Sequence, residues 1–139
     1  MLTNKLILGL DPGRDKTGLA LVDSNGRLIQ VQVVPTGNVP AVLPELAARA
    51  RVLVIGDGTT SAKMQQMVRQ LVPDKKLIVI NETSSTEAAR PLYWQEHPPA
   101  GWRKLVPLGM LVPPEPLDGY AAAILARRYL QQQETTTQE

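Results

Sequence analysis

The side chains that could perform chemistry in this chain are mainly carboxylates. Its 139 residues include no cysteine and a single histidine, His97. Without cysteine there is no thiolate nucleophile, disulfide or cysteine-ligated metal site, and one imidazole cannot build a zinc site of two or three histidines. A Ser-His-Asp triad would have to use His97, which precedes two prolines and is expected in an exposed loop. Catalysis therefore has to rest on Asp and Glu.

Acidic residues follow three predicted strands and open the last predicted helix, where α/β proteins place their ligand sites. They are Asp11, Asp57, Glu82 and Asp118. Asp11 directly follows the apolar run 6–10, which predicts a central strand, and burying an unpaired carboxylate there costs several kcal/mol. The structural alternative is an Asx-type turn after the strand. A functional role for Asp11 is favoured.

A second acidic pair precedes the last helix. Glu115 and Asp118 are three residues apart, which places them near each other on its opening turn. Plain helix capping explains one of the two carboxylates better than both. Three or four converging carboxylates suit Mg²⁺ or Mn²⁺. Two such ions about 3.5 to 4 Å apart can activate water and stabilise the leaving oxygen in phosphodiester hydrolysis.

The hydrophobic pattern predicts the elements that position these residues. Apolar runs bounded by turn residues predict strands at 6–10, 18–22, 28–34, 52–55 and 77–80. Helical periodicity predicts helices at 39–50, 61–71, 87–95 and 117–131. Thr60 or Ser61 is expected to cap the second of these helices. Small residues at 121–123 would allow the last helix to lie tightly on a sheet and carry Asp118 toward the strand ends.

The fold class that follows is α/β, with a mixed five-stranded sheet flanked by helices on both faces. The first three strands pair antiparallel through hairpins, and the other two join in parallel through right-handed crossovers. Residues 1–131 are expected to form a single domain, and 132–139 a polar tail that is frayed or disordered. With no signal peptide and no apolar run of the ~18 residues that span a membrane, we expect no membrane partner and a cytoplasmic protein.

Several short motifs occur in a characteristic order: ILGLDPG at 7–13, TGLALVD at 17–23, VIGDG at 54–58, NETSSTEA at 81–88 and LDGYAAAIL at 117–125. Together they cover most of the chain and resemble the RuvC-like and YqgF-like branch of the RNase H-like superfamily. The opening motif alone is also similar to that of actin-like ATPases and sugar kinases. The ordered set is more specific.

The resemblance implies catalytic metal ligands at Asp11, Glu82 and Asp118, with Mg²⁺ or Mn²⁺ as cofactor. It also implies nuclease activity on structured nucleic acid, either four-way Holliday-junction DNA or precursor ribosomal RNA. Asp57 holds the topological position where RNase H-like enzymes often keep their second carboxylate, so Asp57 and Glu82 compete for one role. YqgF-like proteins usually have Asp-Glu-Arg where this chain has Asn-Glu-Thr at 81–83, so a basic residue expected near the site is missing.

Basic and aromatic side chains supply candidate contacts to nucleic acid. They are Arg14, Lys16, Lys63, Arg90, Trp102, Arg103 and Lys104. Only Arg14 and Lys16 lie beside Asp11 in sequence, and ordinary surface charge is the alternative for most of the others. Trp102 lies in the proline-rich segment 91–116, where exposed rings could stack on unpaired bases. Covering the edge of a small core is the somewhat favoured alternative for Trp94 and Trp102.

The sequence therefore favours a metal-dependent nuclease. The alternative is a non-catalytic nucleic-acid-associated or ribosome-associated module that retains the fold. An ATP-binding half domain of the actin-like class ranks lowest, because such proteins normally need a second lobe to close over the nucleotide. A net charge of +2 permits a nucleic-acid partner without requiring one. Resolvase-type enzymes act as dimers, so a homodimer is also considered, although no sequence signal establishes it.

Overall fold

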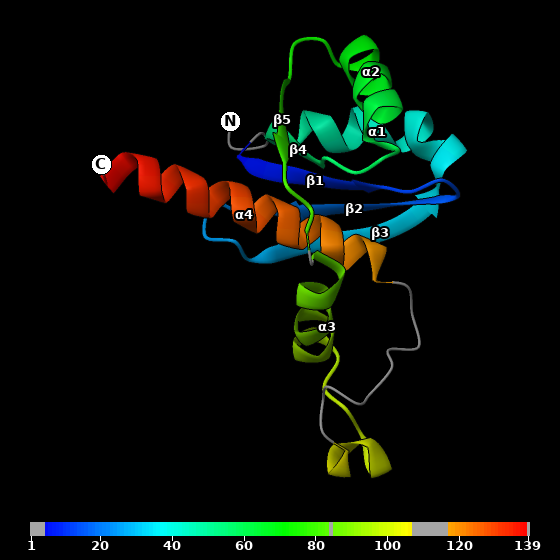
Figure 1. The fold of residues 1–139 in the computed structure, drawn as a ribbon, viewed down its shortest axis with the longest axis vertical. Coiled ribbons are helices and arrows are strands. Elements are labelled where there is room, and N and C mark those ends of the chain that lie inside the picture. Colours follow the sequence, from blue (N-terminus) through cyan, green and yellow to red (C-terminus); the bar gives the residue numbers. More distant parts are fainter. Residues whose placement is uncertain (1–4, 84, 107–116, 139) are drawn as a thin grey trace.

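A five-stranded mixed sheet forms the centre of the computed structural model, which describes residues 5–83, 85–106 and 117–138 (Figure 1). The strands are β1 (Leu6–Pro12), β2 (Lys16–Val22), β3 (Leu28–Pro35), β4 (Ala50–Gly56) and β5 (Lys76–Ile80). Their order across the sheet is β3-β2-β1-β4-β5. β1, β2 and β3 pair antiparallel, whereas β4 is parallel to both β1 and β5. The predicted mixed sheet is confirmed.

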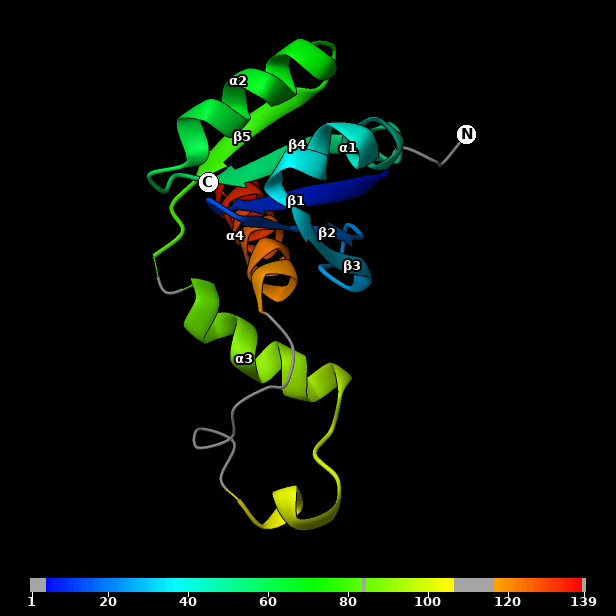
Figure 2. The same ribbon diagram turned by 90° about the vertical axis from the view of Figure 1, so that its right-hand side faces the viewer.

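Helices cover both faces of this sheet (Figures 1 and 2). They are α1 (Val39–Ala48), α2 (Ser61–Leu71), α3 (Ser85–Glu96) and α4 (Asp118–Gln138), with short 3-10 helices η1 (Thr36–Asn38) and η2 (Gly101–Leu105). α1 and α2 pack on one face and α4 runs along the other, with α3 packed against α4. Within the described ranges, no helix has both the length and the apolar character needed to cross a membrane.

The sheet separates two apolar cores, because alternate residues of a strand point to opposite faces. On β1, Leu8 and Leu10 join the core under α1 and α2, whereas Ile7 joins the core under α4. By the same alternation, Asp11 takes the α4 face. The two-residue alternation of side chains along β1 therefore determines which face of the sheet carries this carboxylate.

Helix α4 lies unusually close to the sheet. A Cβ atom on Gly9 of β1 would overlap the backbone oxygen of Ala122, and one on Gly18 of β2 would overlap the backbone carbonyl of Asp118. Ala122 and its neighbours Ala121 and Ala123 are fully buried. The backbone of α4 therefore packs directly against the backbone of β1 and β2, and the first turn of α4 lies directly above β2.

Two helices differ from the sequence prediction at their ends. α4 continues to Gln138, so the segment after residue 131 that was expected to be a frayed tail is helical as far as 138. Glutamine and glutamate lose little side-chain freedom in a helix, and an existing helix extends at small cost. α3 spans Ser85–Glu96 with Pro91 inside it, slightly longer than the predicted 87–95.

An arm formed by α3 and η2 extends away from the sheet (Figures 1 and 2). Aromatic rings join it to α4: the rings of Tyr93 and Tyr120 meet edge to face at 5.4 Å, and His97 Nε2 lies 2.9 Å from the Tyr120 hydroxyl. His97 is exposed, as expected, although its ring is held by this contact. Trp94 is 5% exposed and belongs to the core, whereas the side chain of Trp102 lies outside the described residues.

Candidate metal centre

Asp11 and Asp118 lie near each other at the carboxyl end of β1, close enough for the charge of Asp118 to act on Asp11. Asp11 pairs with Gly18 on the neighbouring strand β2. The backbone carbonyl of Asp118 lies so close above Gly18 that a Cβ there would overlap it. Both acidic residues are half-buried. The missing side chain of Gly18 thus allows the start of α4 to sit beside Asp11.

Glu82 reaches the same region across a glycine turn. It follows β5, which is separated from β1 by β4. A Cβ on Gly56 would lie 2.5 Å from Glu82 Oε2, and a Cβ on Gly58 would overlap Glu82 Oε1. The carboxylate of Glu82 therefore lies over the turn that ends β4. Any side chain at Gly58 would displace it.

Asp57, between these two glycines, makes a different contact. Its Oδ1 accepts a hydrogen bond from the backbone N–H of Glu82 at 3.1 Å. The side chain of Asp57 is exposed, whereas Glu82 is half-buried. In this geometry, Asp57 holds the backbone that carries Glu82.

The three carboxylates are coupled electrostatically. Burial, followed by the negative charges of Glu82 and Asp118, raises the pKa of Asp11 from 3.8 to about 7. A divalent cation among them would reverse this effect, and an all-oxygen donor set is the kind that Mg²⁺ and Mn²⁺ take. Among the described residues, no group of three or more acidic or histidine side chains is already spaced to hold an ion. Closing on a common ion therefore requires side-chain movement.

The remaining predicted site residues fall into three groups. Arg14 and Lys63, far apart in sequence, line one pocket beside the end of β1, and Lys16 is exposed at the start of β2. Arg90 and Lys104 are exposed on the arm. Glu115 and the side chains of Trp102 and Arg103 lie outside the described residues.

Sequence reasoning did not identify the threonines that fix the turn after β1. Thr60 Oγ1 donates to the backbone oxygen of Pro12 at 2.9 Å, so this residue at the start of α2 ties the helix to β1 and makes no side-chain capping bond. Thr36 Oγ1 donates to the oxygen of Gly13 at 2.8 Å and lies 3.0 Å from the hydroxyl of Thr17. Each partner is at least 19 residues away in sequence, so local patterns carry no signal of these bonds.

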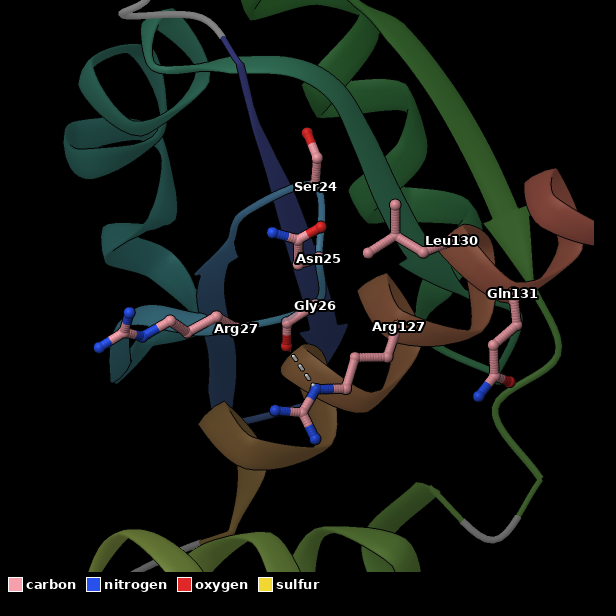
Figure 3. Close-up of a pocket in the computed structure, with 7 residues that line it drawn as sticks. All are labelled: Ser24, Asn25, Gly26, Arg27, Arg127, Leu130 and Gln131. Atoms are coloured by element: carbon pink, nitrogen blue, oxygen red, sulfur yellow. Dashed lines mark hydrogen bonds between the residues drawn. The ribbon is translucent and has the colours of Figure 1, made fainter.

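A separate pocket lies at the opposite end of the sheet, between the β2–β3 turn and α4 (Figure 3). Its lining is mostly polar, and Arg127 Nε donates to the backbone oxygen of Gly26 at 2.7 Å. None of the predicted site residues lines this pocket.

Comparison with known proteins identifies the fold. No protein-family model matches the sequence, and no curated protein matches it. The structure of T. thermophilus RuvC in complex with a Holliday junction substrate has a TM-score of 0.62 and 16% sequence identity, with 96% of this chain and 98% of that chain covered. The chain has the RNase H-like fold of RuvC. A second Thermus thermophilus RuvC structure agrees, with a TM-score of 0.54, 17% identity and coverage of 87% and 90%. The RNase H-like fold predicted from the motifs is thereby confirmed.

Proposed function

We propose that this chain is a metal-dependent endonuclease that cleaves phosphodiester bonds in branched or structured nucleic acid. The observation that carries the proposal is that Asp11, Glu82 and Asp118 come from three separate parts of the chain to one end of the sheet, where burial and then the charges of Glu82 and Asp118 raise the pKa of Asp11. The RuvC fold over almost the whole chain supports the reaction class. Because that RuvC is bound to a Holliday junction, junction DNA is the first substrate, and precursor ribosomal RNA the second.

In this proposal Asp11, Glu82 and Asp118 hold Mg²⁺ or Mn²⁺. A bound divalent ion supplies an activated water and neutralises charge at the scissile phosphate. Asp11 has to lose its proton to act as a ligand, so loading strengthens as the pH rises through about 7. Asp57 positions Glu82 through the Glu82 backbone N–H. Asp57 and Glu115 are also retained as further proposed ligands.

Nucleic-acid contacts are proposed on both sides of this centre. Arg14, Lys16 and Lys63 would contact phosphates near the end of β1. Trp102, Arg103, Arg90 and Lys104 would extend the surface along the arm. A homodimer, which allows two symmetric nicks in a junction, and a cytoplasmic location complete the proposal.

A cleavage assay tests the nuclease proposal. Labelled four-way junction DNA and precursor ribosomal RNA are incubated with the protein and Mg²⁺ or Mn²⁺. We expect cleavage of at least one substrate, abolished by chelation and reduced at least ~100-fold in Asp11→Asn and Asp118→Asn. Asp15→Asn is the matched control, because Asp15 is an exposed acid in the turn after β1. Cleavage that is equal in Asp11→Asn and the parent protein would exclude the proposed centre.

The alternative is a nucleic-acid-associated module without catalysis. One observation favours it: the described acidic residues are not already spaced to hold an ion. In the same assay this alternative predicts binding of junction or RNA, measured by gel shift, without cleavage at any divalent metal concentration.

A further inference from the structure

A second pocket adjoins the candidate metal centre around the end of β1. Four segments form its walls: the turn after β1, the start of η1, the loop before α2, and α2 itself. Met64 and Met67 of α2 provide an apolar floor, and Arg14 and Lys63 provide cations. The proposed cleavage step leaves this apolar floor without a role.

The walls of this pocket are held together by hydrogen bonds. The hydroxyl of Thr60 donates to the oxygen of Pro12, and that of Thr36 donates to the oxygen of Gly13. These bonds join segments 48 and 23 residues apart in sequence. The pocket is therefore preformed, which lowers the entropy cost of binding a ligand in it.

The chemistry of the lining matches a nucleotide. Methionine side chains are polarisable and adapt to flat rings, and the two cations attract a phosphate. Thr59 adds a hydroxyl that can bond to a base edge or sugar. Among the described residues that line the pocket, none is acidic. Its volume of about 530 Å³ falls within the range of small-molecule sites.

The position of the pocket relates this nucleotide to the cleavage site. Gly13, at the pocket wall, is two residues from Asp11, a span of at most about 7 Å. Neighbouring nucleotides in a stacked strand are about 3.4 Å apart, so one or two nucleotides cover the backbone span between the pocket wall and Asp11. Asp11, however, takes the α4 face of the sheet, whereas the pocket opens on the α2 face.

We infer that this pocket binds one nucleotide of the substrate, unstacked from its neighbours, next to the phosphate that is cleaved. A strand that reaches both sites has to bend around the end of β1, which separates this base from the stack. Unstacking costs least where a base is already poorly stacked, as at a branch point. The inference rests on the proposed nuclease function and adds to it a binding position for the base beside the cleaved phosphate.

Fluorescence of 2-aminopurine tests the inference, because its emission depends on stacking. The base is placed in turn at each position flanking the crossover of a four-way junction, and in a parallel set at the unpaired positions of a structured RNA. Binding is measured without divalent metal, so that cleavage does not interfere. We expect one position to change emission on binding. In Thr59→Phe, which fills the pocket from an exposed wall residue, that change should be lost.

A matched pair of charge variants tests the cationic rim. Lys63→Ala and Arg69→Ala each remove one exposed positive charge from α2, but only Lys63 lines the pocket. We expect Lys63→Ala to reduce the slope of log affinity against log salt by about one, and Arg69→Ala to leave it unchanged. Both variants and Thr59→Phe change exposed residues, so thermal unfolding should match the parent protein.

The outcomes separate the pocket from the nuclease function. Cleavage with no 2-aminopurine change at any position, or identical behaviour of Lys63→Ala and Arg69→Ala, overturns the pocket and leaves the nuclease in place. A 2-aminopurine change that Thr59→Phe abolishes, without cleavage of either substrate, supports a nucleotide-binding pocket but overturns both the nuclease and the place of the pocket beside a cleaved phosphate. Failure to bind either nucleic acid overturns both.

Discussion

Asp11 is subject to two opposing demands. Burial and two neighbouring carboxylates favour its neutral form, which is why its pKa rises to about 7. Metal ligation requires the charged form. The free energy of unfolding of the metal-free protein should therefore report on this residue directly.

The first prediction concerns pH. Folded Asp11 keeps its proton up to about pH 7, whereas the unfolded chain loses it near 3.8, so unfolding releases a proton between these values. The stabilising contribution of Asp11 is complete below pH 3.8 and is lost as the pH rises through about 7. Without metal, the unfolding free energy from this group should fall across that range, and Mn²⁺ should restore stability above pH 7.

Urea unfolding at several pH values, with and without Mn²⁺, measures this dependence. Asp11→Asn removes the titrating group, so its stability should fall less between pH 5 and pH 8 than that of the parent protein, and Mn²⁺ should stabilise it less. Parallel pH curves for the variant and the parent would contradict the assignment.

Gly58 gives a second prediction at the residue scale. Its backbone conformation is one that alanine adopts, and the nearest atoms to an added Cβ belong to the Glu82 carboxylate. Gly58→Ala should therefore move that carboxylate while leaving the fold intact. We expect Mn²⁺ affinity and cleavage to fall roughly 10- to 100-fold, as for other changes that misorient a ligand.

Calorimetric titration with Mn²⁺ and the junction cleavage assay measure these effects. Gly37→Ala is the matched control, because an added Cβ there has open space around it. Equal Mn²⁺ affinity in the two glycine variants would show that Glu82 is not held in place by the turn.

The sequence predicts these residues unequally. Asp11 and Asp118 can be proposed from the sequence because Asp11 stands at the end of an apolar run and Asp118 at the start of a periodic segment. The choice between Asp57 and Glu82 depends on whether the side chain of Glu82 lies over the turn after β4. The sequence shows that both residues follow strands, but it does not show the path of that side chain. The bonds from Thr36 and Thr60 are missed for the same reason.

At the scale of elements, helix α4 sets the position of Asp118. The strands and their directions follow from apolar runs and turn residues, and the sequence predicts them closely. The end of α4 is not predicted, because polar residues 132–138 look like a tail unless they continue an existing helix. The close approach of α4 to the sheet depends on glycines in the strands. In the sequence these glycines indicate only that the strands are weakened at those positions, not that a helix packs there.

Gly18→Ala tests this packing. Its Cβ would overlap backbone atoms of Asp118 and Gly119, so the first turn of α4 has to shift. We expect a loss of about 1–3 kcal/mol in unfolding free energy, typical of overpacked sites. Because Asp118 moves with the helix, Mn²⁺ affinity should fall in the fraction that remains folded. Unchanged stability and Mn²⁺ binding would show that α4 does not depend on this glycine.

On the scale of the whole molecule, the sheet separates the core under α1 and α2 from Asp11 and Asp118, which lie on the α4 side. The core under α1 and α2 contains Leu43, which is fully buried, whereas Asp118 begins the helix on the other face and Ile7 packs under it. Damage to the first core should reach the proposed metal centre only by unfolding the protein.

Leu43→Ala tests this separation. Removing a buried leucine side chain should cost about 2–5 kcal/mol of unfolding free energy. At a temperature where the variant is still folded, its cleavage rate per folded molecule should stay within about twofold of the parent. Circular dichroism fixes the folded fraction and the junction assay the rate. A rate that falls in proportion to lost stability while the protein remains folded would contradict the separation.

The backbone contacts between α4 and the sheet also bear on how such a sequence can change over time. Contact between main-chain atoms constrains the positions that must lack a side chain, such as Gly9 and Gly18, and the small buried residues packed beside them, such as Ala122. Substitutions at other positions of the helix and strands can accumulate while α4 keeps its position on the sheet. This chain holds the architecture of T. thermophilus RuvC although the two share only 16% of their residues.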